Sequence, residues 1–211
     1  RRRHSFPTRR SSDLGYAFIA DSIYLELGGY RKLNGATLSR LGAGKDSEVP
    51  LTGFTPYYRL AYTKDFKHQN LSIGLIGLNS SFKPADGSGE KDKFKDIGLD
   101  ASYQFLGTRK HIATVNAAYI REKQTLDYTL AEGGADNRSQ TLKSYNINAA
   151  YYFKNTYGAT GGLFGSKGNE DATLYPDNRL ARPNTNGTTV QLDWTPTGKE
   201  SLDRKSTRLN S

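Results

Sequence analysis

Residues 96–105 (DIGLDASYQF) alternate strictly between polar and apolar side chains, and this pattern constrains the fold more than any other feature. Successive side chains of a β-strand point to opposite faces, so the segment predicts a strand with one apolar and one polar face. A helix would place both kinds of side chain on each face. Similar runs occur at residues 111–120, 144–153 and 189–194, and weaker ones at 22–30, 57–63, 70–78 and 157–165. The sequence therefore predicts an all-β fold with about eight strands.

The connections between these strands alternate between short and long. The short ones are 64–69, 106–110 and 154–156, and the long ones are 31–53, 83–93, 121–141 and 166–187. Consecutive strands usually pair, which predicts an antiparallel up-and-down order. Tight turns at one end and long loops at the other are typical of a barrel that spans an outer membrane. We expect a transmembrane β-barrel that is incomplete within this chain.

Both ends of the chain are predicted to lie outside the domain. Residues 10–14 can be encoded by DNA containing GCTCTTCCGATCT, and the reverse complement encodes residues 203–206 in another frame. That DNA resembles adapters used in short-read sequencing. We expect residues 1–14 and 203–211 to be adapter-derived and disordered, and residues 15–202 to be the partial barrel, with the true N-terminus missing.

This interpretation changes the charge of the protein. The formal net charge of +9 falls to +3 for residues 15–202, because residues 1–14 carry +4 and residues 203–211 carry +2. The remaining basic residues are scattered among acidic ones, so we expect no nucleic-acid partner. There is no cysteine, which excludes disulfides and thiolate metal sites, and no apolar run approaches the ~20 residues of a membrane helix.

The polar face of the predicted strands is the candidate functional surface. In a barrel its charged and amide side chains line the lumen and set ion preference. The predicted lumen-facing residues are Arg59, Asp96, Asp100, Gln104, Asn116, Asn146, Asn148, Gln191 and Asp193. So many polar groups favour a hydrated interior and a parent barrel of more than eight strands, since about eight strands enclose only side chains.

Aromatic residues of the apolar face cluster near the predicted ends of the strands. We expect a membrane-interface girdle at the short-turn end from Tyr103, Phe105, Tyr151, Phe153 and Trp194, and an opposite girdle from Tyr119 and Tyr145. A membrane barrel requires Ile97, Leu99, Ala101 and Val115 to face outward, whereas a soluble barrel buries them.

The periodicity and loop rhythm of residues 15–202 resemble those of a Gram-negative outer-membrane β-barrel of the porin type. The resemblance rests on no signature motif. It implies the bacterial outer membrane as location, the lipid bilayer and lipopolysaccharide as partners, small hydrophilic solutes as cargo, and a homo-oligomer as one possible assembly. It implies passive diffusion through the lumen.

Two alternatives remain open: a barrel without a channel whose long outer loops bind partners, and a soluble ligand-binding β-barrel. We expect no enzyme, no cofactor and no metal site. The segment RLGAGKDS lacks phosphate-loop spacing, and His68 and His111 sit at short turns without a second ligand at metal spacing.

Overall fold

The computed structural model describes residues 10–32, 53–83, 89–107 and 110–195. Nearly all of them lie in strands: β1 (Arg10–Ile19), β2 (Ile23–Lys32), β3 (Phe54–Phe66), β4 (Gln69–Phe82), β5 (Asp92–Phe105), β6 (His111–Leu126), β7 (Ser139–Phe153), β8 (Tyr157–Gly168) and β9 (Thr185–Trp194). A five-residue helix, α2 (Asp127–Ala131), and a 3-10 turn, η2 (Arg179–Ala181), lie in two of the connections.

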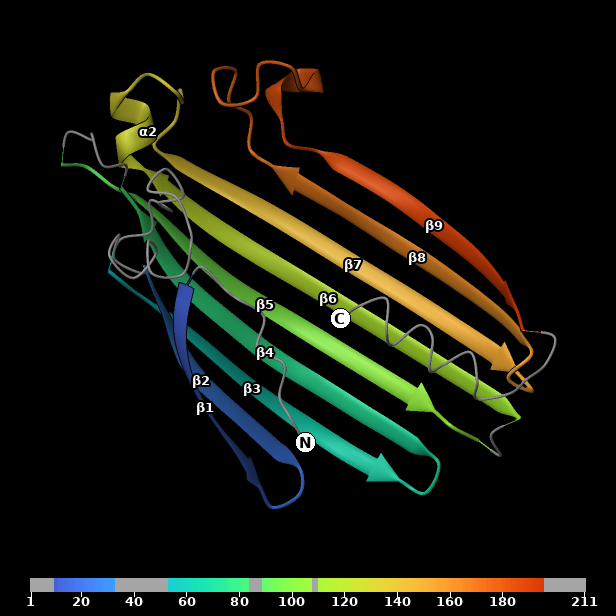
Figure 1. The fold of residues 1–211 in the computed structure, drawn as a ribbon. Helices are drawn as coiled ribbons and strands as arrows, with labels where there is room; N and C mark the ends of the chain where they lie inside the picture. Colours follow the sequence, from blue (N-terminus) through green and yellow to red (C-terminus); the bar gives the residue numbers. More distant parts are fainter. Residues whose placement is uncertain (1–9, 33–52, 84–88, 108–109, 196–211) are drawn as a thin grey trace, which may run out of the picture.

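The strands form one antiparallel sheet in which each strand pairs with the next along the chain (Figure 1). This arrangement confirms the predicted all-β, up-and-down fold. The alternation of connections is also confirmed, because short turns join β1 to β2, β3 to β4, β5 to β6 and β7 to β8, and the intervening connections are longer.

Two of the short turns use left-handed backbone conformations at both central residues. Ala20 and Asp21 have φ of 49° and 50°, and Lys154 and Asn155 have φ of 53° and 52°. Positive φ at both positions matches the twist of the flanking strands and produces a tight hairpin. A backbone hydrogen bond also joins the first of these turns to β3: the Thr63 N–H donates to the Ser22 carbonyl at 2.7 Å.

Several strands extend further toward the long loops than the sequence predicts. β6 continues to Leu126 instead of ending at residue 120, and β7 begins at Ser139 instead of residue 144. In these extensions both faces carry polar side chains, so the apolar alternation is lost while backbone pairing continues. Periodicity therefore detects the part of a strand with an apolar face and misses its polar end.

β1 is a ninth strand that the sequence analysis did not predict. It begins at Arg10, so residues 10–14 pair with residues 28–32, whereas we predicted disorder there. Backbone hydrogen bonds do not depend on side chains, and an unpaired strand edge accepts any extended neighbour. Residues 1–9 and 203–211 lie outside the described residues, and the domain boundary at residue 15 stays a prediction.

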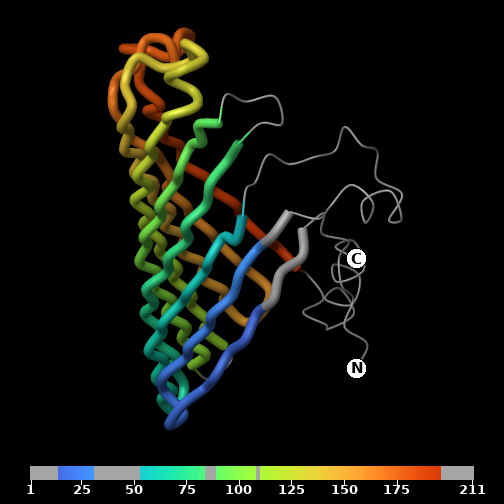
Figure 2. The backbone as a smooth tube through the Cα atoms, turned by 90° about the vertical axis from the view of Figure 1, so that its left-hand side faces the viewer, coloured from blue at the N-terminus to red at the C-terminus, as the bar shows by residue number. Residues whose placement is uncertain are grey.

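The sheet curves into a trough whose strands run from β1 at one rim to β9 at the other (Figure 2). No second layer covers either face among the described residues. The buried hydrophobic side chains of this part of the chain are Ala61, Leu126 and Ala135, which are too few and too small to make a packed core. A fold with so little core needs an environment that covers its apolar surface.

Candidate pore-lining face

The register of the nine strands assigns every predicted lumen residue to the same face of the sheet. Directly paired residues share a face, and so do residues two apart on one strand. Asp100, for example, pairs with Ala118 on β6, which pairs with Asn146 on β7. The same steps place Arg59, Asp96, Gln104, Asn116, Asn148, Gln191 and Asp193 on this face.

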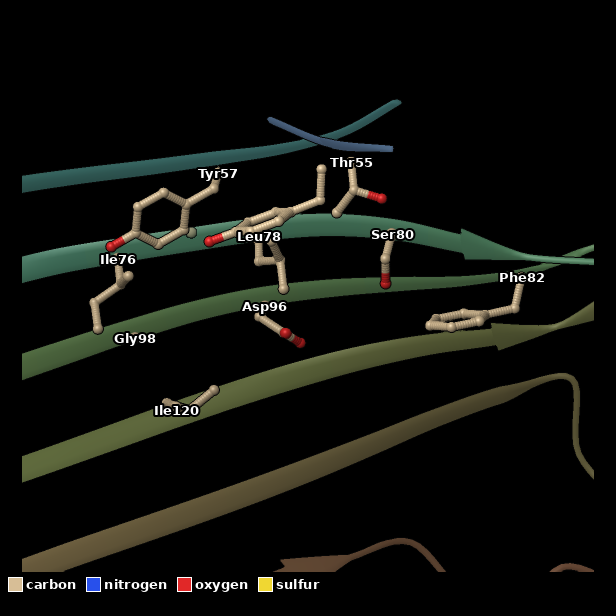
Figure 3. Close-up of a pocket in the computed structure, with 11 residues that line it drawn as sticks. Thr55, Tyr57, Ile76, Leu78, Ser80, Phe82, Asp96, Gly98 and Ile120 are labelled. Carbon is tan, nitrogen blue, oxygen red and sulfur yellow. The ribbon is translucent and has the colours of Figure 1, made fainter. Parts of the chain in front are cut away.

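This polar face is the concave side of the trough. A cavity of about 470 Å³ lies on it and is lined by residues of five consecutive strands, β2 to β6 (Figure 3). Side chains from five neighbouring strands converge on one cavity only where the sheet bends toward them. We call the polar side the concave face and the apolar side the convex face.

Charges are separated between the two faces. Among the strand residues whose side chains the structure describes, the concave face carries Glu26, Asp65, Asp92, Asp96, Asp100, Glu122 and Asp193, with Arg59 as its one cation. The charged strand residues of the convex face, within the same described set, are Lys64, Lys93, Lys95, Arg121, Lys123, Lys143 and Lys167. The concave face is therefore strongly acidic.

Arg59 and Asp100 form an ion pair across the concave face. The Arg59 Nη2 lies 2.6 Å from the Asp100 Oδ2, although the two residues belong to β3 and β5. Gly74 of β4 lies between them, and a Cβ there would come within 2.3 Å of Asp100 Oδ1. The guanidinium also lies 5.7 Å from the Tyr24 ring centroid. The concave face thus neutralises its one described cation locally.

An amide ladder continues the polar surface toward β7. The Ser102 hydroxyl donates to Asn116 at 2.8 Å, Asn116 donates to Asn148 at 3.1 Å, and Asn148 donates to Asn146 at 3.3 Å. The predicted Asn residues are therefore brought together by the register. Asn116 and Asn146 are exposed and Asn148 is half-buried, which leaves their remaining hydrogen-bonding capacity to solvent.

The sequence analysis missed four acidic residues of the concave face, Glu26, Asp65, Asp92 and Glu122. Asp65 and Asp92 were assigned to connections between strands. Glu122 pairs directly with Asp96 across β5 and β6, but it was assigned to a long loop because the apolar alternation stops at Ile120. Glu26 lies in a predicted strand and accepts a 3.1 Å hydrogen bond from the Tyr24 hydroxyl. Its position between alternating Leu25 and Leu27 would have identified it as a concave-face residue.

The convex face carries a continuous apolar belt across all nine strands. It comprises Ala17, Ile19, Ile23, Leu25, Leu27, Leu60, Tyr62, Ile73, Leu75, Ile97, Leu99, Ala101, Val115, Ala117, Tyr119, Tyr145, Ile147, Ala149, Ala159, Leu163, Val190 and Leu192. Leu99 is 56% exposed and Val115 is 40% exposed on this face.

The predicted aromatic residues lie on this convex face, at the ends of the belt. Tyr119 and Tyr145 pair directly with each other toward the long loops. At the short-turn end, Phe153 pairs with Tyr157, which pairs with Trp194. Tyr103, Phe105 and Tyr151 occupy the same face. Tyr157 was not predicted, because it is the first residue after a short turn.

A row of cations borders the belt on the long-loop side. This basic row consists of Lys95, Arg121, Lys123, Lys143 and Lys167. Direct pairs of like charge occur within it, Lys95 with Lys123 and Lys143 with both Arg121 and Lys167. None of the five forms an ion pair with another described residue. Facing like charges destabilise a sheet unless an anion lies between them.

The loops beyond the basic row are joined by a buried carboxylate. Asp171 is 1% exposed and accepts hydrogen bonds from the backbone N–H groups of Asp136, Asn137 and Leu174 at 2.9–3.0 Å and from Gln140 Nε2 at 2.7 Å. Burial alone would raise the pKa of Asp171, but these backbone hydrogen bonds hold the pKa below its usual range.

Asp136 in turn accepts hydrogen bonds from the residues that follow Asp171. Its carboxylate accepts hydrogen bonds from the N–H groups of Ala172 and Thr173 at 2.9 and 3.1 Å and from the Thr173 hydroxyl at 2.7 Å. The β6–β7 and β8–β9 connections therefore form one unit, which we call the loop clamp.

Of the two histidines named above, His68 lies between β3 and β4, and His111 begins β6. The His111 Nδ1 lies 2.6 Å from the Tyr151 hydroxyl, next to a short turn. Within residues 10–32, 53–83, 89–107 and 110–195, no cluster of three or more His, Asp or Glu residues has a metal-binding arrangement. In the same residues, no helix is long and apolar enough to cross a membrane.

Comparisons with protein-family models, with curated proteins and with solved structures find no match for this chain. The fold itself defines the class: an all-β protein built on a nine-stranded antiparallel up-and-down sheet.

Proposed function

We propose that the chain is part of a β-barrel in a bacterial outer membrane and acts as a porin-like channel for passive diffusion of small hydrophilic solutes or ions. The observation that carries this proposal is the separation of the two faces over nine strands. The convex face presents the apolar belt, and the concave face presents acidic and amide side chains. A lipid-exposed barrel with a hydrated lumen requires that arrangement.

The dimensions of the belt support a membrane location. On β7 the convex face is apolar from Tyr145 to Phe153. At ~3.4 Å per residue this stretch covers about 27 Å, which a strand tilt of ~40° reduces to about 21 Å along the membrane normal. The apolar band of outer-membrane barrels is ~25 Å tall.

The basic row supports contact with anionic lipid headgroups. It runs across β5 to β8, a width of about 14 Å at ~4.8 Å per strand. Arg121, Lys143 and Lys167 line a depression of about 300 Å³ immediately above the belt. Phosphate groups of the bilayer or of lipopolysaccharide would separate these facing cations and remove their repulsion.

A membrane location also sets a requirement on the edges of the sheet. Unpaired backbone groups are costly in lipid, so the outer edges of β1 and β9 have to find partners. Pairing with further strands, or with a second copy of the chain, closes the barrel. Closure around the concave face turns the acidic surface into the lumen wall.

The acidic lumen favours cations over anions. Arg59 is paired with Asp100, which leaves the other concave carboxylates as the net charge of the wall. Solutes pass by diffusion along a hydrated path, and the wall raises the local concentration of cations.

Planar-bilayer recording of the refolded full chain tests this proposal. We expect stepwise conductance and, in a salt gradient, a reversal potential that shows cation preference. Refolded protein that enters the bilayer as a closed barrel, formed by one chain or by two copies, but does not conduct, or a preference for anions, would contradict the channel.

The single tryptophan offers a test of the membrane location that does not depend on conductance. Trp194 is 69% exposed on the convex face next to a short turn. In vesicles we expect its emission to shift to the blue and to be quenched by lipids brominated on their acyl chains. Emission typical of water, with no quenching, would favour a soluble barrel.

A second candidate function is partner binding by the outer loops without a channel. The loop clamp favours it, because Asp136 and Asp171 hold two connections in one arrangement and so preform a surface. A protein that inserts, fails to conduct and keeps an ordered clamp would support this alternative.

A further inference from the structure

The lining of the cavity on the concave face is needed neither by a hydrated pore wall nor by a packed core, because it combines apolar and aromatic side chains with a carboxylate. Its walls are mostly apolar and aromatic, with Tyr57 from β3 and Ile76, Leu78 and Phe82 from β4 (Figure 3). A hydrated lumen wall needs no such surface. At about 470 Å³, the cavity is large enough for a small organic molecule.

A missing side chain creates part of this space. Gly98 of β5 is buried and lies between Ile76 and Ile120 on the neighbouring strands. A Cβ at Gly98 would lie 3.1 Å from a side-chain carbon of Ile120. Glycine therefore leaves room at the floor of the cavity, where any other residue would press against the adjacent strand.

Two polar atoms in the cavity have no partner among the residues that the structure describes. One carboxylate oxygen of Asp96 and the hydroxyl oxygen of Thr55 are buried without a hydrogen bond to any of these residues. Asp96 is the only charged residue among the described residues that line the cavity. A buried oxygen without a donor loses its hydration and gains nothing in return. Both atoms can accept hydrogen bonds, so the complementary group is a donor.

The charge around Asp96 defines the sign of the ligand. Glu122 lies directly opposite Asp96 on β6, and the nearest described cation of this face, Arg59, is already paired with Asp100. A positive group between these residues relieves their repulsion. The aromatic faces of Tyr57 and Phe82 are also favourable neighbours for a cation.

We propose that this cavity binds a small organic ammonium ion, with its ammonium group at Asp96 and Thr55 and its apolar part against the aromatic and aliphatic wall. A hard metal cation does not fit, because it needs about six oxygen ligands and the wall is mainly apolar. The inference deepens the proposed function by naming a class of solute. It rests on that function for transport, while binding itself needs only the cavity.

Isothermal titration of the refolded full chain in detergent with benzylammonium tests the site, and benzyl alcohol serves as the neutral analogue. We expect benzylammonium to bind and benzyl alcohol to bind at least tenfold more weakly. Asp96→Asn should weaken benzylammonium binding at least tenfold. The matched control is Asp193→Asn, which removes a carboxylate of the same face on β9 and should leave binding unchanged.

Thr55→Val provides a second variant that keeps the shape of the side chain, and we expect it to weaken binding several-fold. Circular dichroism checks that each variant folds. Equal binding of the alcohol and the ammonium ion, or equal effects at Asp96 and Asp193, would overturn the proposal. Bilayer recording separates the two proposals: binding without conductance removes the channel and keeps the site, whereas conductance without benzylammonium binding keeps the channel and removes the site.

Discussion

Asp171 shows how one residue orders the long-loop end of the molecule. It is a carboxylate in an otherwise polar loop, and its sequence neighbours give no sign of burial. In the structure its oxygens accept hydrogen bonds from a loop more than thirty residues earlier in the chain. Burying a charge is stable only when such donors surround it.

We expect Asp171→Asn to loosen the loop clamp, because the new amide places N–H groups against the N–H donors of Asn137 and Gln140. The cost is on the order of 1–3 kcal/mol for the unsatisfied buried groups. Hydrogen exchange measured by mass spectrometry should show faster exchange in residues 134–140 and 169–175. Asp177→Asn, an exposed position in the same loop, is the control and should leave exchange unchanged.

The clamp should also depend on pH. The pKa of Asp171 is lowered in the folded state, so its contribution to stability is fully present above the ordinary aspartate pKa of ~3.9. It is lost as the pH falls through the lowered folded value. Hydrogen exchange of residues 134–140, corrected for the intrinsic pH dependence of exchange, should therefore stay constant down to about pH 4. Loss of protection near neutral pH would contradict this assignment.

At the scale of an element, β6 shows how a single strand serves two environments. Ala117 pairs with Ala101 and Ile147 on the convex face, whereas the next residue, Ala118, pairs with Asp100 and Asn146 on the concave face. The two alanines are identical in size and adjacent in sequence. They differ only in the face that they occupy.

Lysine at these two positions tests which face meets lipid. We expect Ala117→Lys to destabilise the protein folded in lipid vesicles by about 2–4 kcal/mol, the cost of a cation near the bilayer midplane. Ala118→Lys should cost less than about 1 kcal/mol, because it faces the acidic wall. Urea titration in vesicles measures both values. Similar costs for the two variants would argue against the assignment of the faces.

At the scale of the whole molecule, the convex face carries in order, from the short turns to the long loops, a group of aromatic residues, the apolar belt, the Tyr119–Tyr145 pair and the basic row. The basic row arises only when four strands are aligned, because each strand contributes one or two cations. Alignment places them at the same height. The basic row is therefore a property of the assembled sheet and of no single strand.

We expect the double variant Lys143→Gln and Lys167→Gln to bind lipid A, the diphosphorylated anchor of lipopolysaccharide, more weakly by about 2 kcal/mol at low salt. Native mass spectrometry of the detergent-solubilised protein measures lipid retention. The control, Lys64→Gln with Lys154→Gln, removes the same charge at the short-turn end. Equal losses in the two double variants would show nonspecific attraction and contradict a role for the basic row.

The candidate site was predictable in part. Alternation along single strands identified Asp96, Asp100 and the Asn residues as members of one face, because that inference needs only local geometry. Glu122 was missed, since β6 continues as a strand where its apolar pattern ends. The Arg59–Asp100 ion pair and the cavity at Gly98 depend on the relative register of separate strands, which one strand's pattern does not contain.

The sequence by itself determined eight of the nine strands, the two chemically distinct faces and the alternation of short and long connections. These properties follow from side-chain period and turn chemistry, which are local. Only the tertiary structure decided that the polar face is the concave one, that Asp96 and Thr55 share a cavity, and that Asp136 and Asp171 exchange hydrogen bonds. The reason is physical: curvature and cross-strand register are set by the coiling and pairing of the whole sheet.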